Sequence, residues 1–276
     1  MMLGTVLVLT AAFSVGDEPP EVPSAHKRWI SVYRGIAESV TMRRGDTVLT
    51  FVPQPLHFYT NPVRMNDQHG AIFLWTESGR PAVIGSIWSA MNRQNPAVRF
   101  VTHEWHSLLV DKNVSATRDD VKLWTSGEPG VSWTRLETAP APAASRPQRL
   151  VQMRSLARRY AGEIDVEGES DLRLMDQPLF RYAEQMEGAL DGAIFVLAMA
   201  TDPELLIWLE ARPSEGHAAW HVAFARFGNK AMKVKEGDKT VWSCEAGAPG
   251  YSDGKYYLRW RAEEMPAAPD TTERIP

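Results

Sequence analysis

The sequence predicts an α+β protein made of two tandem copies of one module, and three observations support this prediction. The chain repeats itself at an offset of 118 to 123 residues, which matches the size of one small domain. Each copy opens with a helical pattern and continues with strand-like apolar segments. The period is too long for a solenoid. We therefore expect two repeats, each an N-terminal helix packed on a curved antiparallel sheet of about five or six strands.

Several short segments recur in the two copies at nearly constant spacing. The recurring pairs are the Gln-Pro-Leu segments at 54–59 and 177–182, the Gly-Ala-Ile-Phe runs at 70–73 and 192–195, Pro81 and Pro203, Trp124 and Trp242, and the Pro-Gly pairs at 129–130 and 249–250. Because they survive in both copies, we interpret them as parts of the folded core. A binding site usually survives duplication in one copy only.

A helix is expected at the start of each copy. Between Trp29 and Val40, apolar residues recur at helical spacing, and Ser24 is a candidate N-cap. Residues 150–160 show the same spacing, with Pro147 near the first turn. The opposite face of this second helix carries Arg149, Arg154, Arg158 and Arg159. Such a face is ordinarily solvated, and a basic binding face is the alternative.

Strand-like segments follow each helix in the same order. They are residues 47–52 and 170–175, the two Gly-Ala-Ile-Phe strands, residues 98–105 and 220–227, and a last pair centred on Trp124 and Trp242. Residues 201–206 begin like a helix, but their counterpart at 79–87 has β-branched residues and an internal glycine. We expect a hairpin in both copies, with the proline in the turn. The layout is similar to cystatin-like and NTF2-like folds, an analogy that carries no function.

The predicted boundaries divide the chain into five parts. Residues 1–16 are expected to be a signal peptide, because the apolar run at 3–15 is shorter than the ~20 residues that span a bilayer. Repeat domain 1 covers 17–136, a Pro/Ala linker 137–146, repeat domain 2 147–264, and a disordered tail 265–276. Export to the periplasm or the exterior follows from the signal peptide, and no transmembrane segment is expected.

Composition excludes several classes of protein. The first 135 residues contain 13 Lys+Arg and 12 Asp+Glu, and the remainder 17 and 22, so neither half has the basic excess of a nucleic-acid surface. With Cys244 as the single cysteine, no disulfide or cysteine-based metal site forms within the chain. We expect Cys244 to be a small buried hydrophobe. No cofactor is expected, since phosphate-binding and dinucleotide-binding loops are missing from the sequence.

A group of short strings together resembles one protein family. The strings are residues 59–64, 73–76, 79–81, 103–108, 139–142, 152–157, 177–179 and 201–204. They span about residues 25–245, and their combination is similar to an uncharacterised family of secreted two-repeat proteins common in planctomycete bacteria. The resemblance implies export and a two-part architecture. It implies no catalytic residue.

The segment His103-Glu104-Trp105-His106 is the main candidate for chemistry. It differs from the zincin motif, in which two histidines lie four apart on a helix. In a strand, His103 and His106 would point to opposite faces, so one metal could reach both only if the strand kinks. In that case His57, together with His69 and Asp67, could complete a ligand set. Ordinary buried or surface histidines are the alternative.

One further motif is weaker. The Gly-Tyr-Ser-Asp-Gly sequence at 250–254 fits the pattern of a serine nucleophile, but that elbow needs a strand before it and a helix after it. Here a strand-like run follows, so we interpret the segment as a loop.

The function predicted from the sequence is a non-catalytic, exported binding or interaction protein. The ligand would lie in a groove between the repeats or on a concave sheet, where Trp75, Trp88 and Trp105 are the candidate binding residues. A cell-envelope protein or a glycan is the expected partner. The alternative is a metal-dependent or general-base hydrolase that uses His103, Glu104 and His106. A third interpretation makes both repeats packing units of a larger envelope assembly.

Overall fold

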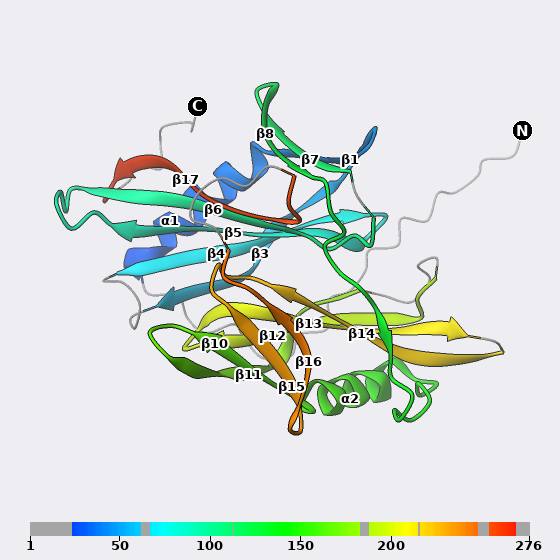
Figure 1. Cartoon of the computed structure of the whole chain (residues 1–276). Helices are drawn as coiled ribbons and strands as arrows, with labels where there is room; N and C mark the ends of the chain where they lie inside the picture. Colours follow the sequence, from blue (N-terminus) through cyan, green and yellow to red (C-terminus); the bar gives the residue numbers. More distant parts are fainter. Residues whose placement is uncertain are drawn as a thin grey trace, which may run out of the picture.

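The computed structural model describes residues 24–61, 67–111, 113–182, 188–214, 216–247 and 254–268. The expected signal peptide, most of the Gly-Tyr-Ser-Asp-Gly segment and residues 269–276 of the expected tail lie outside this described part. The described part of the chain is mostly β, with two helices. Each of two helices precedes a set of antiparallel strands, and the two sets lie one above the other (Figure 1).

Both predicted helices are present. The first, α1, covers Ser24–Glu38, and the second, α2, covers Arg146–Ala157. The Ser145 side chain caps α2 by accepting a hydrogen bond from the backbone N–H of Gln148, and Pro147 lies in the first turn. The arginines of α2 do not form a free basic face. Arg149 is buried in the core, and the other three pair with acids or amides of neighbouring strands.

The upper layer in Figure 1 contains two sheets, and all of their strands except β17 come from the first half of the chain. A five-stranded sheet has the order β17-β6-β5-β4-β3, and a four-stranded sheet has the order β2-β1-β7-β8. The bounds of the five-stranded sheet are β3 Thr50–Asn61, β4 Gln68–Glu77, β5 Arg80–Met91, β6 Val98–Ser107 and β17 Tyr257–Pro266. Those of the smaller sheet are β1 Thr41–Arg44, β2 Thr47–Val48, β7 Val114–Arg118 and β8 Val121–Ser126.

The second half forms one strongly curled sheet of eight strands, in the order β16-β15-β10-β11-β12-β13-β14-β9. Its strands are β9 Thr134–Arg135, β10 Tyr160–Asp165, β11 Glu169–Tyr182, β12 Asp191–Met199, β13 Asp202–Ser214, β14 His217–Arg226, β15 Met232–Glu236 and β16 Lys239–Cys244. The expectation of two equal sheets of five or six strands is therefore too simple. In the first half the strands are divided between two separate sheets, whereas in the second half the corresponding strands form one continuous sheet.

The two halves exchange their last strands. Strand β9 belongs to the first half by sequence but pairs with β14 of the second. Strand β17 follows the second half but pairs with β6 of the first, along nine register positions. In Figure 1 the chain after β8 crosses to the lower layer, and β17 lies in the upper layer beside β6. Sequence reasoning did not predict this exchange.

The repeated Gln-Pro-Leu segments form the same irregularity in both halves. In the first, Val52 pairs with Leu74 and His57 pairs with Ile72. Strand β3 therefore contains three more residues than β4 between these two pairs, which is a bulge. In the second, Met175 and Phe180 bracket an equal bulge against β12. Proline has no N–H to give to the ladder, and a bulge is where a strand tolerates it.

The predicted hairpins are present at both ambiguous segments. Strands β4 and β5 join at Ser78 and Gly79, and β12 and β13 join at Ala200 and Thr201. The prolines lie one residue inside β5 and β13 rather than in the turn. Each sits at a register shift, where Pro81 faces Thr76 and Pro203 faces Ala198. The missing N–H is tolerated there because the ladder is already irregular.

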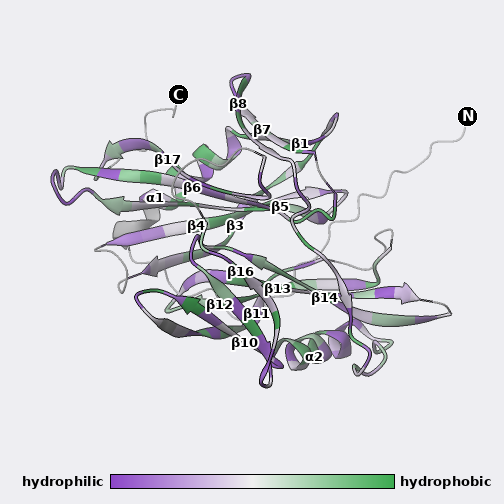
Figure 2. Cartoon of the chain, in the orientation of Figure 1, coloured by the Kyte–Doolittle hydropathy of each residue, from purple (hydrophilic) through white to green (hydrophobic). Residues whose placement is uncertain are grey.

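Three apolar clusters hold the molecule together. One lies between α1 and the five-stranded sheet, and another between α2 and the curled sheet. The third lies between the two layers and contains residues of both, including Ile72, Ile84, Ile194 and Trp208. Figure 2 accordingly shows hydrophobic colour along the central strands of both layers. The two halves thus bury one shared interior, and cavities at its edges are lined by residues of both halves.

Candidate functional site

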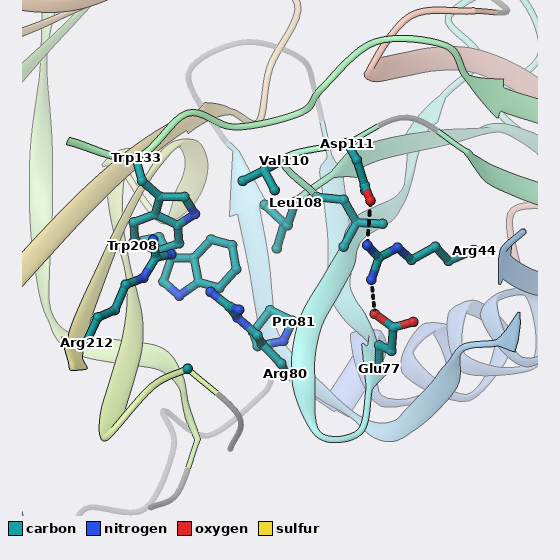
Figure 3. A pocket seen from close by; sticks show the side chains of 12 residues that line it. Arg44, Glu77, Arg80, Pro81, Leu108, Val110, Asp111, Trp133, Trp208 and Arg212 are labelled. Atoms are coloured by element: carbon teal, nitrogen blue, oxygen red, sulfur yellow. Dashed lines mark hydrogen bonds and ion pairs between the residues drawn. The ribbon is translucent and has the colours of Figure 1, made fainter. Parts of the chain in front are cut away.

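A cavity of about 280 Å³ opens between the two halves, and we call it the tryptophan cavity. Its lining comprises Arg44, Glu77, Arg80, Pro81, Leu108, Leu109, Val110, Asp111, Trp133, Gly188, Trp208 and Arg212. Figure 3 shows Trp133, Trp208 and Arg212 on one side and Leu108, Arg44 and Asp111 on the other. This volume is slightly smaller than that of typical small-molecule sites, which measure roughly 300–1,000 Å³.

Two indole rings form one wall of the tryptophan cavity. The centroids of Trp133 and Trp208 are 4.6 Å apart, with ring planes inclined at 60°. Trp133 comes immediately before β9, so the exchange of that strand brings it against the second half. The Arg212 guanidinium lies 3.8 Å from the centroid of the Trp133 ring and fixes it by a cation–π contact. Trp133 is half-buried, whereas Trp208 is buried.

A buried carboxylate organises the arginines beside this wall. The Glu210 side chain is fully buried and accepts hydrogen bonds from Arg80 Nη2 at 2.7 Å, from Arg212 and from the Tyr182 hydroxyl. Burial, and next the charge of Glu210, raise the pKa of Tyr182 well above its ordinary value, so its hydroxyl stays protonated and donates. Arg80 comes from the first half and Glu210 from the second. The ion pair therefore also links the layers.

Arg44 closes the opposite side of the tryptophan cavity. Its guanidinium bridges Glu77 and Asp111, as the dashed lines in Figure 3 show. These two carboxylates raise the pKa of Arg44 above its ordinary value. Every charge at the rim is thus compensated by a neighbour, and the cavity presents planar donors and carboxylate acceptors held in place. Val110 is 58% exposed beside them and gives this side an apolar edge.

A second cavity, of about 340 Å³, lies between the same two layers, and we call it the acidic cavity. Its lining comprises Gln68, Trp88, Glu104, Val166, Glu167, Asp202, Glu204, Phe227, Gly228, Asn229, Lys230 and Arg259. Glu104 accepts hydrogen bonds from the Tyr257 hydroxyl at 2.5 Å and from Trp88 Nε1 at 2.8 Å. Arg259 belongs to β17, so the exchanged strand contributes to this cavity, as Trp133 beside β9 contributes to the other.

The two cavities occupy equivalent places relative to the recurring segments of the sequence. Residues just after β6 line the tryptophan cavity, and residues just after β14 line the acidic one. Arg80 and Asp202, which precede the repeated prolines, line one cavity each. The same position thus carries a cation in one cavity and an anion in the other.

The histidines of the main candidate segment are not brought together. Strand β6 runs in unbroken register with β5, so it has no kink. His103 lies with Trp105 and Trp260 on one face, with ring centroids 5.3 and 4.6 Å away. His106 lies on the other face beside Tyr256 and Tyr257.

Both histidines are fully buried. Burial, helped by the charge of Arg118, lowers the pKa of His103 to about 3. Burial also lowers the pKa of His106 to about 3, against the opposing effect of the Nδ1 hydrogen bond to the Ser107 carbonyl at 2.6 Å. Neutral, enclosed imidazoles of this kind belong to the core.

His57 does not join them either. Its Nε2 lies 3.1 Å from the Thr201 carbonyl of the other half, and burial lowers its pKa. Within the described part of the chain, no three His, Cys, Asp or Glu side chains gather in a group that could hold a metal ion. Cys244 is half-buried at the end of β16, and burial raises the pKa of its thiol. A raised pKa disfavours the reactive thiolate.

Of the three tryptophans expected to bind, one lines a cavity. Trp88 is at the acidic cavity, although it is 5% exposed and holds Glu104. Trp75 and Trp105 are 1% and 0% exposed inside the cluster under α1, so a ligand cannot reach them. Large aromatic residues on sheet strands fill both faces, and the sequence does not reveal which face another layer covers.

Sequence reasoning missed Trp133, Trp208, Arg80, Arg212 and Glu210. Trp208 and Glu210 lie two apart on β13 and therefore share one face, a pattern visible in the sequence. Trp133 gave no such signal, because its place depends on the strand exchange.

Comparison of the chain with protein-family models, curated proteins and solved structures gave no match. In the described residues, neither helix is both long and apolar enough to cross a membrane.

Proposed function

We propose that this protein is a non-catalytic binding protein and that the tryptophan cavity is its ligand site. The observation that carries the proposal is the joint construction of the cavity by both halves: Trp133 and Arg80 from the first meet Trp208 and Arg212 from the second. An internal cavity wall made of two inclined indoles, with a hydrogen-bonding rim, serves recognition. The groove between the repeats was the expected location.

The ligand class that fits best is a carbohydrate. The exposed part of the half-buried Trp133 indole offers an apolar surface to a sugar ring, and adjacent hydroxyls match the planar donors of arginine and the paired oxygens of carboxylates. The described charges at the rim are paired with one another, so none of them is left to pair with an ionic ligand. A neutral ligand therefore binds at a smaller desolvation cost than an ion would. A volume of about 280 Å³ suits a small sugar or one end of a longer glycan.

The pairing of the described carboxylates at this cavity supports binding rather than hydrolysis, because Glu77 and Asp111 are both held by Arg44. Glu210 is saturated by Arg80, Arg212 and Tyr182, and it holds them rather than facing a ligand as a base. The hydrolase alternative would need His103 and His106 at one site. We also propose, from the sequence alone, that the chain is exported, that it consists of two copies of a helix-on-sheet module, and that its glycan belongs to a cell envelope.

The test is ligand binding measured on the purified full chain. A glycan array identifies ligands, and titration calorimetry with the best neutral oligosaccharide gives the dissociation constant. We expect quenching of tryptophan fluorescence on binding, because two indoles line the site. The Trp133→Ala variant should bind at least about tenfold more weakly, which corresponds to ~1.4 kcal/mol.

A matched control separates site loss from general damage. Trp242 is also half-buried, but it packs against Phe224 on the far side of the curled sheet. Trp242→Ala should therefore bind the oligosaccharide as the parent protein does, after folding of both variants is checked by circular dichroism. Wild-type affinity in Trp133→Ala, or no ligand on the array, would refute the proposal.

A further inference from the structure

We infer that the two repeats form an obligate strand-exchanged pair, in effect a dimer joined within one chain, and that the connecting segment is not needed to hold them together. The inference is independent of the ligand. It starts from the topology: each layer takes its edge strand from the other half, β17 onto β6 and β9 onto β14. Reciprocal exchange of this kind is the arrangement of a swapped homodimer.

Each apolar core contains residues that belong to the other half by sequence. Leu258 of β17 is fully buried in the cluster under α1, and Trp260 packs against it. In return, Leu136 packs against the cluster under α2, and its N–H donates to the Trp220 carbonyl at 2.8 Å. Neither core is complete without the other half, so neither half is expected to fold alone.

Polar contacts between the two halves of the sequence repeat the pattern. The Tyr257 hydroxyl satisfies the buried carboxylate of Glu104, and Arg80 reaches the buried carboxylate of Glu210. Asn61 donates to Asp202 at 2.7 Å. Separation of the halves would remove these hydrogen-bond partners, and a carboxylate that stays buried without its partner is destabilising, which opposes dissociation.

The connecting segment has its own attachment and does not act as the tether. The Gln152 side chain donates a hydrogen bond to the Ala141 carbonyl and accepts one from the Ala143 N–H. The Arg149 guanidinium donates to the carbonyls of Ala143 and Ala144. Arg149 in turn pairs with the fully buried Asp191. The segment is thus bound to α2 in the second half, and a cut before it would leave this attachment intact.

The first experiment cuts the folded chain. A protease site is inserted between Pro140 and Ala141 of the full-length protein, which is then purified and cleaved. We expect the two fragments to co-elute at the size of the intact 30.9 kDa protein and to part only in denaturant. Elution as two separate, folded monomers would overturn the inference.

The second experiment traps the exchange itself. In a Cys244→Ser background, cysteines replace the register partners Phe100 and Glu264, or the partners Arg135 and His221. Facing residues in an antiparallel ladder lie within the range of a disulfide. After oxidation and cleavage, each pair should hold the two fragments in one band on a non-reducing denaturing gel.

The matched control tests the unexchanged alternative. If β9 lay beside β6 of its own half, cysteines at Phe100 and Arg135 would come close together. In the exchanged protein they remain free thiols, which a thiol titration counts. A disulfide in this control, with separate fragments from both partner pairs, would overturn the inference. A cysteine variant that fails to fold leaves the cleavage experiment, made with the parent sequence, to decide.

Discussion

The buried histidines show at the residue scale how a sequence motif can mislead. His103 and His106 stand three apart around an acidic residue, yet strand geometry sends them to opposite faces. Both ring nitrogens of His103 and the Nε2 of His106 make no hydrogen bond to protein. Their exclusion from solvent favours the neutral form, so the two residues influence stability rather than chemistry.

We predict that acid destabilises the protein through these residues. In the unfolded chain a histidine binds a proton near pH 6.5, whereas the folded-state pKa is about 3. Between these values the unfolded state binds more protons, so stability is full above about pH 6.5 and falls as the pH drops toward 3. The loss approaches ~1.4 kcal/mol per pH unit per histidine. Urea unfolding at pH 7.5, 6, 5 and 4 measures it.

A substitution assigns the slope to its source. His103→Gln removes one titrating group, and the double variant with His106→Gln removes both. The pH dependence between 6.5 and 4 should flatten in two steps, even if the variants are less stable at pH 7.5. An unchanged slope in the double variant would contradict the prediction and move the acid sensitivity to other groups.

At the scale of elements, the repeated glycines have a specific packing role. Tyr59 faces Gly70 across β3 and β4, and Tyr182 faces Gly192 across β11 and β12. A Cβ added at Gly192 would come within 2.0 Å of the Tyr182 hydroxyl oxygen. The tyrosine ring therefore lies over the glycine, and the Gly-Ala-Ile-Phe and Gln-Pro-Leu segments are repeated together because they contact each other.

We predict that Gly192→Ala destabilises the protein by about 1–3 kcal/mol, the usual cost of overpacking. In a Tyr182→Leu background the ring that meets the new methyl group is gone, so the added cost of Gly192→Ala should shrink. A double-mutant cycle of denaturant midpoints measures this coupling. Equal costs in the two backgrounds would show that the tyrosine is not the cause.

Much of the element level was predictable from sequence, for physical reasons. Amphipathic spacing fixes both helices, and the hairpins at Pro81 and Pro203 follow from comparing the copies. The bulges were not predicted, because the proline of the Gln-Pro-Leu segment does not reveal which backbone hydrogen bonds between the strands are missing. The positions of β9 and β17 could not be predicted either, because local patterns do not identify a strand's partner.

At the scale of the whole molecule, the shared interior predicts a single cooperative unit. We expect tryptophan fluorescence and far-ultraviolet circular dichroism to report coincident unfolding transitions. Phe195→Ala, in the cluster under α2, should cost about 3–5 kcal/mol and lower the midpoint for both halves together. Amide hydrogen exchange of β4 and β5, which lie in the other layer, should become faster if the destabilisation extends to that layer. Unchanged exchange there would indicate two independent units.

The candidate site also depends on this scale. Trp133 reaches Trp208, and Arg259 lies over Trp88, because β9 and β17 each join the opposite half. The sequence indicated a groove between repeats, but the aromatic residues it indicated were the larger set that fills the core. To distinguish Trp133, which lines a cavity, from Trp105, which lies in the core, the pairing of the strands must be known.

The late position of β17 has a consequence for biosynthesis. Glu104 and its partner Tyr257 are 153 residues apart, so β6 leaves the ribosome long before the strand that completes its sheet. At the usual speed of translation, about 5–20 residues per second, the interval is roughly 8–30 seconds. During that interval the edge of β6 is open to pairing with other chains. The nascent first half therefore needs either protection or a delay in folding until its last strand is made.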